Sequence, residues 1–228
     1  VSSCKKEEED PTTDTDDATP TVVDCSSFSG SYNFVDNPDL DVDYIVDCKM
    51  LITGDVNIAP GTHIQFRSGA GFSVEDAGSL SAIGTAAAPI VLDGESSAIG
   101  SWLGLMFYSN DVSNRLEYVT VRNGGGGAFN SNDDMGNVIV YADGRLTMNN
   151  CTLDRSGANG SNRAYASATI SMANNSFTNN ILSPILIQAN LVHHIDAGST
   201  FTNSGEDFIY VFCDAIEDAL TWAAFPIH

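Results

Sequence analysis

The residues best suited to chemistry are two adjacent carboxylates, Asp133 and Asp134, which follow a run of four glycines at 124–127. Two carboxylates roughly 6.5–9.5 Å apart can hydrolyse a glycoside, one protonating the leaving group and the other activating water. If the chain is an enzyme, Asp133 and Asp134 are its acid and base candidates, and Arg122 or Arg155 would contact the substrate. We favour a simpler interpretation, a solvated loop inserted between two strands.

A second group of candidates is aromatic, because modules that bind neutral glycans commonly present exposed rings beside polar groups. Tyr108, Tyr118 and Phe129 fall in the middle of the chain. Phe129 lies in the glycine-rich loop, so we expect it to be the most exposed of the three. Together with Arg122 and Arg155 they form the candidate ligand-binding set.

The metal candidate is a set of alternating acids, Asp39, Asp41 and Asp43. It resembles the start of a calcium loop, whose ligands are oxygens. An EF-hand then needs Gly, and Glu at position twelve, but Tyr44 and Met50 stand there and exclude it. We favour the interpretation that these residues are alternating acids on an exposed strand. We therefore expect no cofactor, and a calcium ion is the one alternative.

Five cysteines are present, and their spacings contain no CxxC pattern of a zinc or redox motif. Cys25 and Cys48 are the candidates for a disulfide, which an exported protein can form. Cys151 shares strand parity with Leu153, so we expect it to be buried as a small apolar residue.

The elements that position these residues follow from a 24-residue repeat in the second half of the chain. Residues 150–156 recur at 174–180 and, more loosely, at 198–204, each time with a large apolar residue in fourth place. A fixed period of this size indicates stacked supersecondary units. Because the units are rich in Ser, Thr, Asn and Gly and alternate with β periodicity, they predict a parallel β-solenoid.

The repeat also predicts which side chains point inward. Leu153, Phe177 and Phe201 should stack about 4.8 Å apart in successive coils, with their neighbours facing outward. Asn179 and Asn203 follow one turn later, and we expect them to form an inward ladder. From residue 51 onward, strands of three to five residues alternate with Gly and Pro turns, which gives about seven coils.

Several segments together resemble right-handed parallel β-helix domains of bacterial surface proteins; they are 58–66, 78–85, 89–92, 100–107 and 116–125. The resemblance implies an all-β, right-handed parallel β-helix of about seven coils with an N-terminal cap. It identifies an architecture and no particular activity.

Enzymes of this fold include pectin and alginate lyases and polygalacturonases. The lyases need a basic residue, and the expected solenoid contains one lysine, Lys49. Asp133 and Asp134 resemble the Asp-Asp element of polygalacturonases, but the Gly-His-Gly and Arg-Ile-Lys elements of that family are missing. The resemblance therefore favours a non-catalytic protein, with a polysaccharide lyase or glycoside hydrolase as the alternative.

The first residues, Val1-Ser2-Ser3-Cys4, resemble the end of a bacterial lipobox, and residues 4–10 resemble the surface-export signal of Bacteroidetes-type lipoproteins. This resemblance implies lipid attachment at Cys4 and a position on the outer membrane, facing out from the cell. The lipid would be the only attachment to the membrane, since the chain has no apolar stretch of about 20 residues.

The chain divides into three parts. Residues 1–24 form a lipobox remnant and an acidic, disordered tether; residues 25–50 form an N-terminal cap with the first strand; residues 51–228 form the β-helix. Trp222 and Phe225 are candidates for a C-terminal cap over the last coil.

The net charge of −21 excludes nucleic acid as a partner and disfavours polyanionic glycans, because both need clustered Lys and Arg. We therefore expect a surface lipoprotein that serves in adhesion, in binding an extracellular glycan or surface protein, or as a spacer.

Overall fold

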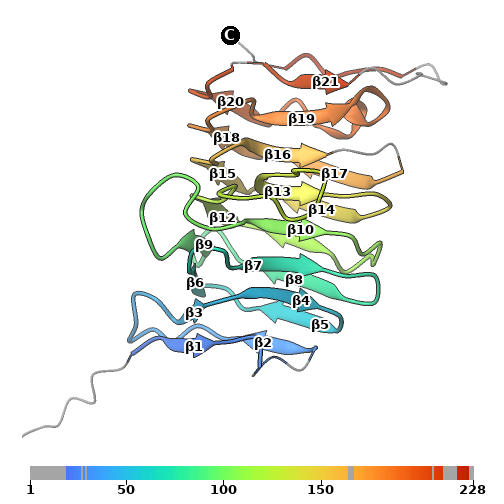
Figure 1. Ribbon diagram of the computed structural model, residues 1–228. Coiled ribbons are helices and arrows are strands. Elements are labelled where there is room, and N and C mark those ends of the chain that lie inside the picture. Colours follow the sequence, from blue (N-terminus) through green and yellow to red (C-terminus); the bar gives the residue numbers. More distant parts are fainter. Residues whose placement is uncertain are drawn as a thin grey trace, which may run out of the picture.

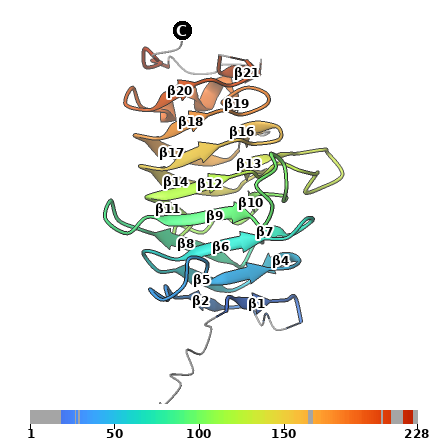
Figure 2. The same cartoon turned by 90° about the vertical axis from the view of Figure 1, so that its left-hand side faces the viewer.

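The computed structural model describes residues 19–26, 28, 30–163, 167–206, 208–212 and 220–225. Parallel strands form three sheets that wrap around one axis, as Figure 1 and Figure 2 show from two sides. The chain is thus an all-β, right-handed parallel β-helix, which confirms the predicted fold class.

In the described part of the chain, the three sheets contain eight, seven and six strands. The eight-stranded sheet consists of β1 (Thr21–Val23), β3 (Tyr44–Val46), β6 (His63–Phe66), β9 (Ile90–Gly94), β12 (Val119–Arg122), β15 (Thr152–Asp154), β18 (Ser176–Thr178) and β20 (Thr200–Thr202). The seven-stranded sheet consists of β4 (Lys49–Ile52), β7 (Gly71–Val74), β10 (Leu105–Phe107), β13 (Gly136–Val140), β16 (Asn159–Arg163), β19 (Ile185–Gln188) and β21 (Tyr210–Phe212). The six-stranded sheet consists of β2 (Tyr32–Phe34), β5 (Asp55–Ile58), β8 (Ser79–Ile83), β11 (Arg115–Glu117), β14 (Arg145–Asn149) and β17 (Thr169–Ala173). A short 3₁₀ helix, η1 (Ala189–His194), follows β19 in the last coil.

The core is built from the alternate residues of each strand, as the repeat predicted. Leu146 pairs in register with Ile170, and Leu153, Phe177 and Phe201 pair in register across β15, β18 and β20. The rings of Phe177 and Phe201 stack with centroids 5.3 Å apart. In this part of the molecule, one full coil therefore contains 24 residues.

The predicted inward ladder of Asn179 and Asn203 is wrong, because both side chains are exposed. Both residues have left-handed backbones, with φ of 54° and 55°, a conformation that Asn tolerates. This turn ends the strand alternation, so the next residue points inward. Asn180 Oδ1 accepts a hydrogen bond from the Ser156 amide at 3.0 Å, and its Nδ2 donates to Ser204 Oγ at 3.5 Å.

The N-terminal end differs from the predicted division. The segment 1–24 was expected to be a tether, but its last residues form strand β1. This strand belongs to the solenoid, because Val23 is buried in the first layer of the core. Residues 25–50 supply β2, β3 and the start of β4, so they contribute to all three sheets. The half-buried rings of Tyr32 and Tyr44 pack against the core at this end.

At the C-terminal end, only one of the two expected capping residues covers the core. The ring of Phe225 packs edge-on against Phe201, with centroids 6.0 Å apart. Trp222 is 43% exposed, so it does not cover the last coil as predicted.

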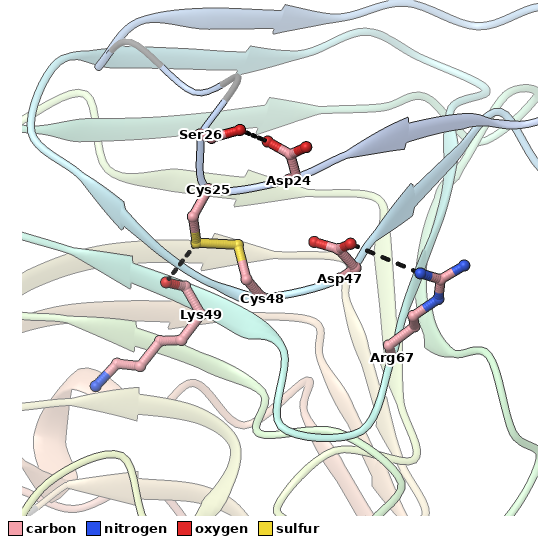
Figure 3. The surroundings of a disulfide bond; sticks show 7 residues. All are labelled: Asp24, Cys25, Ser26, Asp47, Cys48, Lys49 and Arg67. Carbon is pink, nitrogen blue, oxygen red and sulfur yellow. Dashed lines mark hydrogen bonds and ion pairs between the residues drawn. A yellow bond between two sulfur atoms is a disulfide. The ribbon is translucent and has the colours of Figure 1, made fainter.

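A disulfide joins Cys25 to Cys48, the pair expected from the sequence, with the two Cα atoms 6.0 Å apart (Figure 3). It ties the turn after β1 to the residue before β4. Beside it, the Asp47 carboxylate lies 3.6 Å from the Arg67 guanidinium. Cys4 and Cys213 lie outside the described residues.

Two middle coils are lengthened by insertions between the eight-stranded and seven-stranded sheets, at residues 95–104 and 123–135. The second insertion, here called the long corner loop, extends outward at the right of Figure 2, between β12 and β13. The two insertions touch where Gly126 meets Gly100, since a Cβ atom on Gly126 would collide with the Gly100 carbonyl. This close backbone contact accounts for part of the glycine run.

Candidate functional site

The outer face of the seven-stranded sheet carries a continuous column of side chains. Register pairing places Met106, Ile139, Asn162, Leu186 and Tyr210 one above another on β10, β13, β16, β19 and β21. These residues alternate with core residues, so they point away from the solenoid axis. Successive members are separated by the strand spacing of about 4.8 Å.

The long corner loop covers the first two residues of this column, Met106 and Ile139. Phe129, from the loop, packs with Met106 and Ile139 in a small apolar cluster outside the main core, flanked by Tyr108 and Tyr141. Phe129 is only 5% exposed, so the prediction that it is the most exposed aromatic is wrong. Its ring fills the space over two apolar side chains that the sheet would otherwise present to water.

Polar contacts hold the loop in this position. Lys49 Nζ donates a hydrogen bond to the Phe129 carbonyl at 2.7 Å and lies 5.3 Å from the centre of its ring. The rings of Tyr108 and Tyr141 are 4.8 Å apart, and Asn130 donates to the Tyr108 hydroxyl at 3.3 Å. Burial raises the pKa of Tyr108 above its usual range. Tyr108 is therefore part of the support of the loop.

Beyond the loop, toward the C-terminal end, the same face opens into a hollow of about 270 Å³. We call it the C-terminal hollow. One side comes from the loop, and the floor and the other side come from β16, β19 and β21 and the adjoining turns. Its lining consists of Asn132, Asp133, Asp134, Met135, Ala158, Asn159, Asn162, Leu182, Leu186 and Phe212. Both acid candidates from the sequence therefore lie at this site.

The two acids are in different environments. Asp134 is 6% exposed and accepts hydrogen bonds from Asn130 Nδ2 at 2.9 Å and Asn162 Nδ2 at 3.4 Å. Asp133 is exposed and has a left-handed backbone with φ of 57°. The described lining residues include no Lys, Arg or His, so none of them offsets the negative charge of the two acids.

Asn162 stands out among the lining residues. It is 6% exposed, and its Oδ1 atom is buried with no hydrogen-bond partner among the described residues. Its Nδ2 faces Asp134, which fixes the orientation of the amide, because the reversed amide would bring two oxygens together. A buried acceptor without a partner is unfavourable by about 1–3 kcal/mol.

A row of exposed aromatic residues borders the hollow at the last coil. Phe208, Tyr210 and Phe212 are 48%, 46% and 37% exposed, and neighbouring ring centroids are 6.4 and 5.7 Å apart. We call these three residues the aromatic row. Sequence reasoning missed it, although the 24-residue step from Leu186 to Tyr210 and the alternation along β21 carry the signal.

The remaining candidates from the sequence do not line this hollow. Arg122 Nε bonds Asp93 Oδ2 at 2.7 Å, and Arg155 Nε bonds Asn123 Oδ1 at 3.0 Å. These bonds brace the ends of neighbouring strands in the eight-stranded sheet. Tyr118 lies at the opposite corner, between β11 and β12, and is half-buried. The predicted ligand-binding set is therefore not gathered at one place.

Of the three candidate calcium residues, Asp43 uses its side chain to bind the backbone. Asp43 is 4% exposed, and its two carboxylate oxygens accept hydrogen bonds from the Asn37 and His63 amides, each at 2.7 Å. His63 Nδ1 lies 2.7 Å from the Asp41 carbonyl. Asp39, Asp41 and Asp43 belong to no group of three or more His, Cys, Asp or Glu side chains, among the described residues, that would hold a metal ion.

Comparison with known proteins finds no matching family model, curated protein or solved structure. Among the residues that the structure describes, no helix has the length and apolar character needed to cross a membrane. The outer face of the seven-stranded sheet is therefore the part of the molecule that indicates a function.

Proposed function

We propose that the chain is a surface-anchored, non-catalytic β-helix lipoprotein that binds a neutral extracellular glycan. The observation that carries this proposal is the aromatic row beside the C-terminal hollow. The same outward column is covered by the long corner loop at Met106 and Ile139, but it is half-buried at Leu186 and exposed at Tyr210. An exposed apolar patch of this kind, bordered by polar side chains, is typical of an interaction site.

Aromatic rings suit a sugar ligand because the C–H face of a pyranose ring is apolar and its edge is polar. The aromatic row would contact the C–H faces, while the amides and carboxylates of the hollow would accept hydrogen bonds from hydroxyl groups. The net charge of −21 and the two acids in the hollow disfavour uronates, sulfated glycans and nucleic acid.

The position of the aromatic row suits a protein that presents its binding site away from a membrane. Strands β1 and β21 lie at opposite ends of the solenoid (Figure 1). If lipid is attached at Cys4, on the N-terminal side of β1, the aromatic row is at the end of the rod away from the anchor. Cys4 itself lies outside the described residues, so this anchoring rests on the resemblance to a lipobox.

A hydrolase is the second candidate function, favoured by one observation: Asp133 and Asp134 both line the hollow next to the aromatic row. An acid and a base on either side of a glycosidic bond would meet the requirement of an inverting enzyme. Binding and hydrolysis make different predictions for the same assay, because only hydrolysis releases new reducing ends.

The test is retention of the full 228-residue chain on a panel of neutral and acidic glycans, with reducing ends measured in parallel. We expect retention on a neutral glycan without product, and at least a tenfold weaker affinity for the double variant Tyr210→Ala, Phe212→Ala. Val112→Ala, at a 77% exposed apolar site elsewhere, is the control and should bind normally. Reducing ends would support the hydrolase, and failure to bind any neutral glycan would refute the proposal.

A further inference from the structure

The C-terminal hollow presents hydrogen-bond acceptors in excess of donors. Among the described residues, each carboxylate oxygen of Asp134 accepts one hydrogen bond, from Asn130 or Asn162, and a carboxylate oxygen can accept another. Asn162 Oδ1 has no partner among the described residues. Asp133 adds a second carboxylate, and it is exposed at the rim. A ligand that completes this site must supply donors.

We propose that the C-terminal hollow is a subsite for one neutral sugar ring, an inference that rests on the proposed function. In this subsite, hydroxyl groups of the sugar donate hydrogen bonds to Asn162 Oδ1 and to the Asp134 carboxylate. Leu186 and Phe212 contact the apolar face of the ring. The next sugar along the polymer lies over Tyr210 and Phe208, which continue the same face.

The size and chemistry of the hollow select this ligand class. A volume of about 270 Å³ is slightly below the roughly 300–1,000 Å³ of pockets for drug-sized ligands, so it suits a single ring. A hydroxyl group can relieve the unpaired Asn162 acceptor after a small rotation of the amide. A uronate would bring a third carboxylate next to Asp133 and Asp134, and none of the described lining residues is basic and able to offset it.

The test compares single variants of the full chain on a neutral oligosaccharide that the wild type retains and on its uronate counterpart. Asn162→Leu keeps the approximate shape and removes the unpaired acceptor, so we expect about tenfold weaker binding of the neutral sugar. Asn57→Leu is the matched control, an outward Asn on β5 in a different sheet, and should bind as the wild type does. Far-UV circular dichroism and urea unfolding check that each variant folds.

Asp134→Asn provides an independent readout, because it removes a charge at constant size. We expect the preference for the neutral sugar over the uronate to fall at least threefold. If the wild type binds glycans and both variants bind like the wild type, the subsite is refuted while the aromatic row stands. If binding requires calcium and is lost with chelator, the acceptors hold a cation, and the inference is wrong. If the wild type binds no glycan, the proposed function fails, and the subsite with it.

Discussion

Two adjacent asparagines, Asn179 and Asn180, allow a direct test of which residue faces the core. Asn180→Ala leaves the Ser156 amide, which is fully buried, without its acceptor. An unpaired buried amide is unfavourable by about 1–3 kcal/mol. The two further bonds of Asn180, to the Leu153 carbonyl and Ser204 Oγ, are long at 3.5 Å and add little. We therefore expect a loss of about 2 kcal/mol in the free energy of unfolding.

The matched change is Asn179→Gly, because glycine adopts the left-handed backbone of this site without strain. It removes an exposed hydrogen bond to Asp154, which contributes about 0.5 kcal/mol or less. Urea unfolding gives the free energy of unfolding of both variants, and thermal unfolding gives their Tm, each followed by circular dichroism. For a chain of this length, Asn180→Ala should lower the Tm by roughly 4–8 °C. An equal or larger effect of Asn179→Gly would refute the assignment of the inward position.

Two further predictions concern the cysteines. Replacing Cys25 and Cys48 together by serine opens a link across 23 residues and should lower the free energy of unfolding by about 3 kcal/mol; an unchanged urea midpoint would contradict this. Burial raises the pKa of Cys151 to about 12, so its thiol should react with a disulfide reagent at pH 8 only after unfolding. The folded state holds this proton more tightly than the unfolded state does. The contribution of Cys151 to the free energy of unfolding should therefore be complete below the pKa of the unfolded thiol and should fall as the pH rises toward 12. Urea midpoints measured over a series of pH values would test this.

The sequence was most informative where the repeat is regular. The 24-residue step placed Leu153, Phe177 and Phe201 on the inward side, and the register pairs confirm it. Strand alternation alone misplaced the polar ladder by one residue, because it does not account for the left-handed residue that follows β18 and β20. Asn179 and Asn203 are the residues that adopt this conformation, so Asn180 and Ser204 point inward.

The candidate site was predicted only in part. Asp133 and Asp134 were identified from their chemistry, and they do line the C-terminal hollow. Phe129 was expected to be exposed because it follows a glycine run, but the loop folds back onto the outer face of the sheet and buries its ring. The contact partner that holds it, Lys49, is 80 residues away in the chain, so local pattern could not reveal it.

The sequence by itself determined the architecture, because a parallel β-helix repeats one short rule of alternation and spacing in every coil. It also determined that the chain is acidic and that its fold is all-β. Only the tertiary structure decided which part of the outer face is open. That outcome depends on where an inserted loop lies across strands from distant coils. It separates the covered Met106 and Ile139 from the half-buried Leu186 and the exposed Tyr210 of the same column.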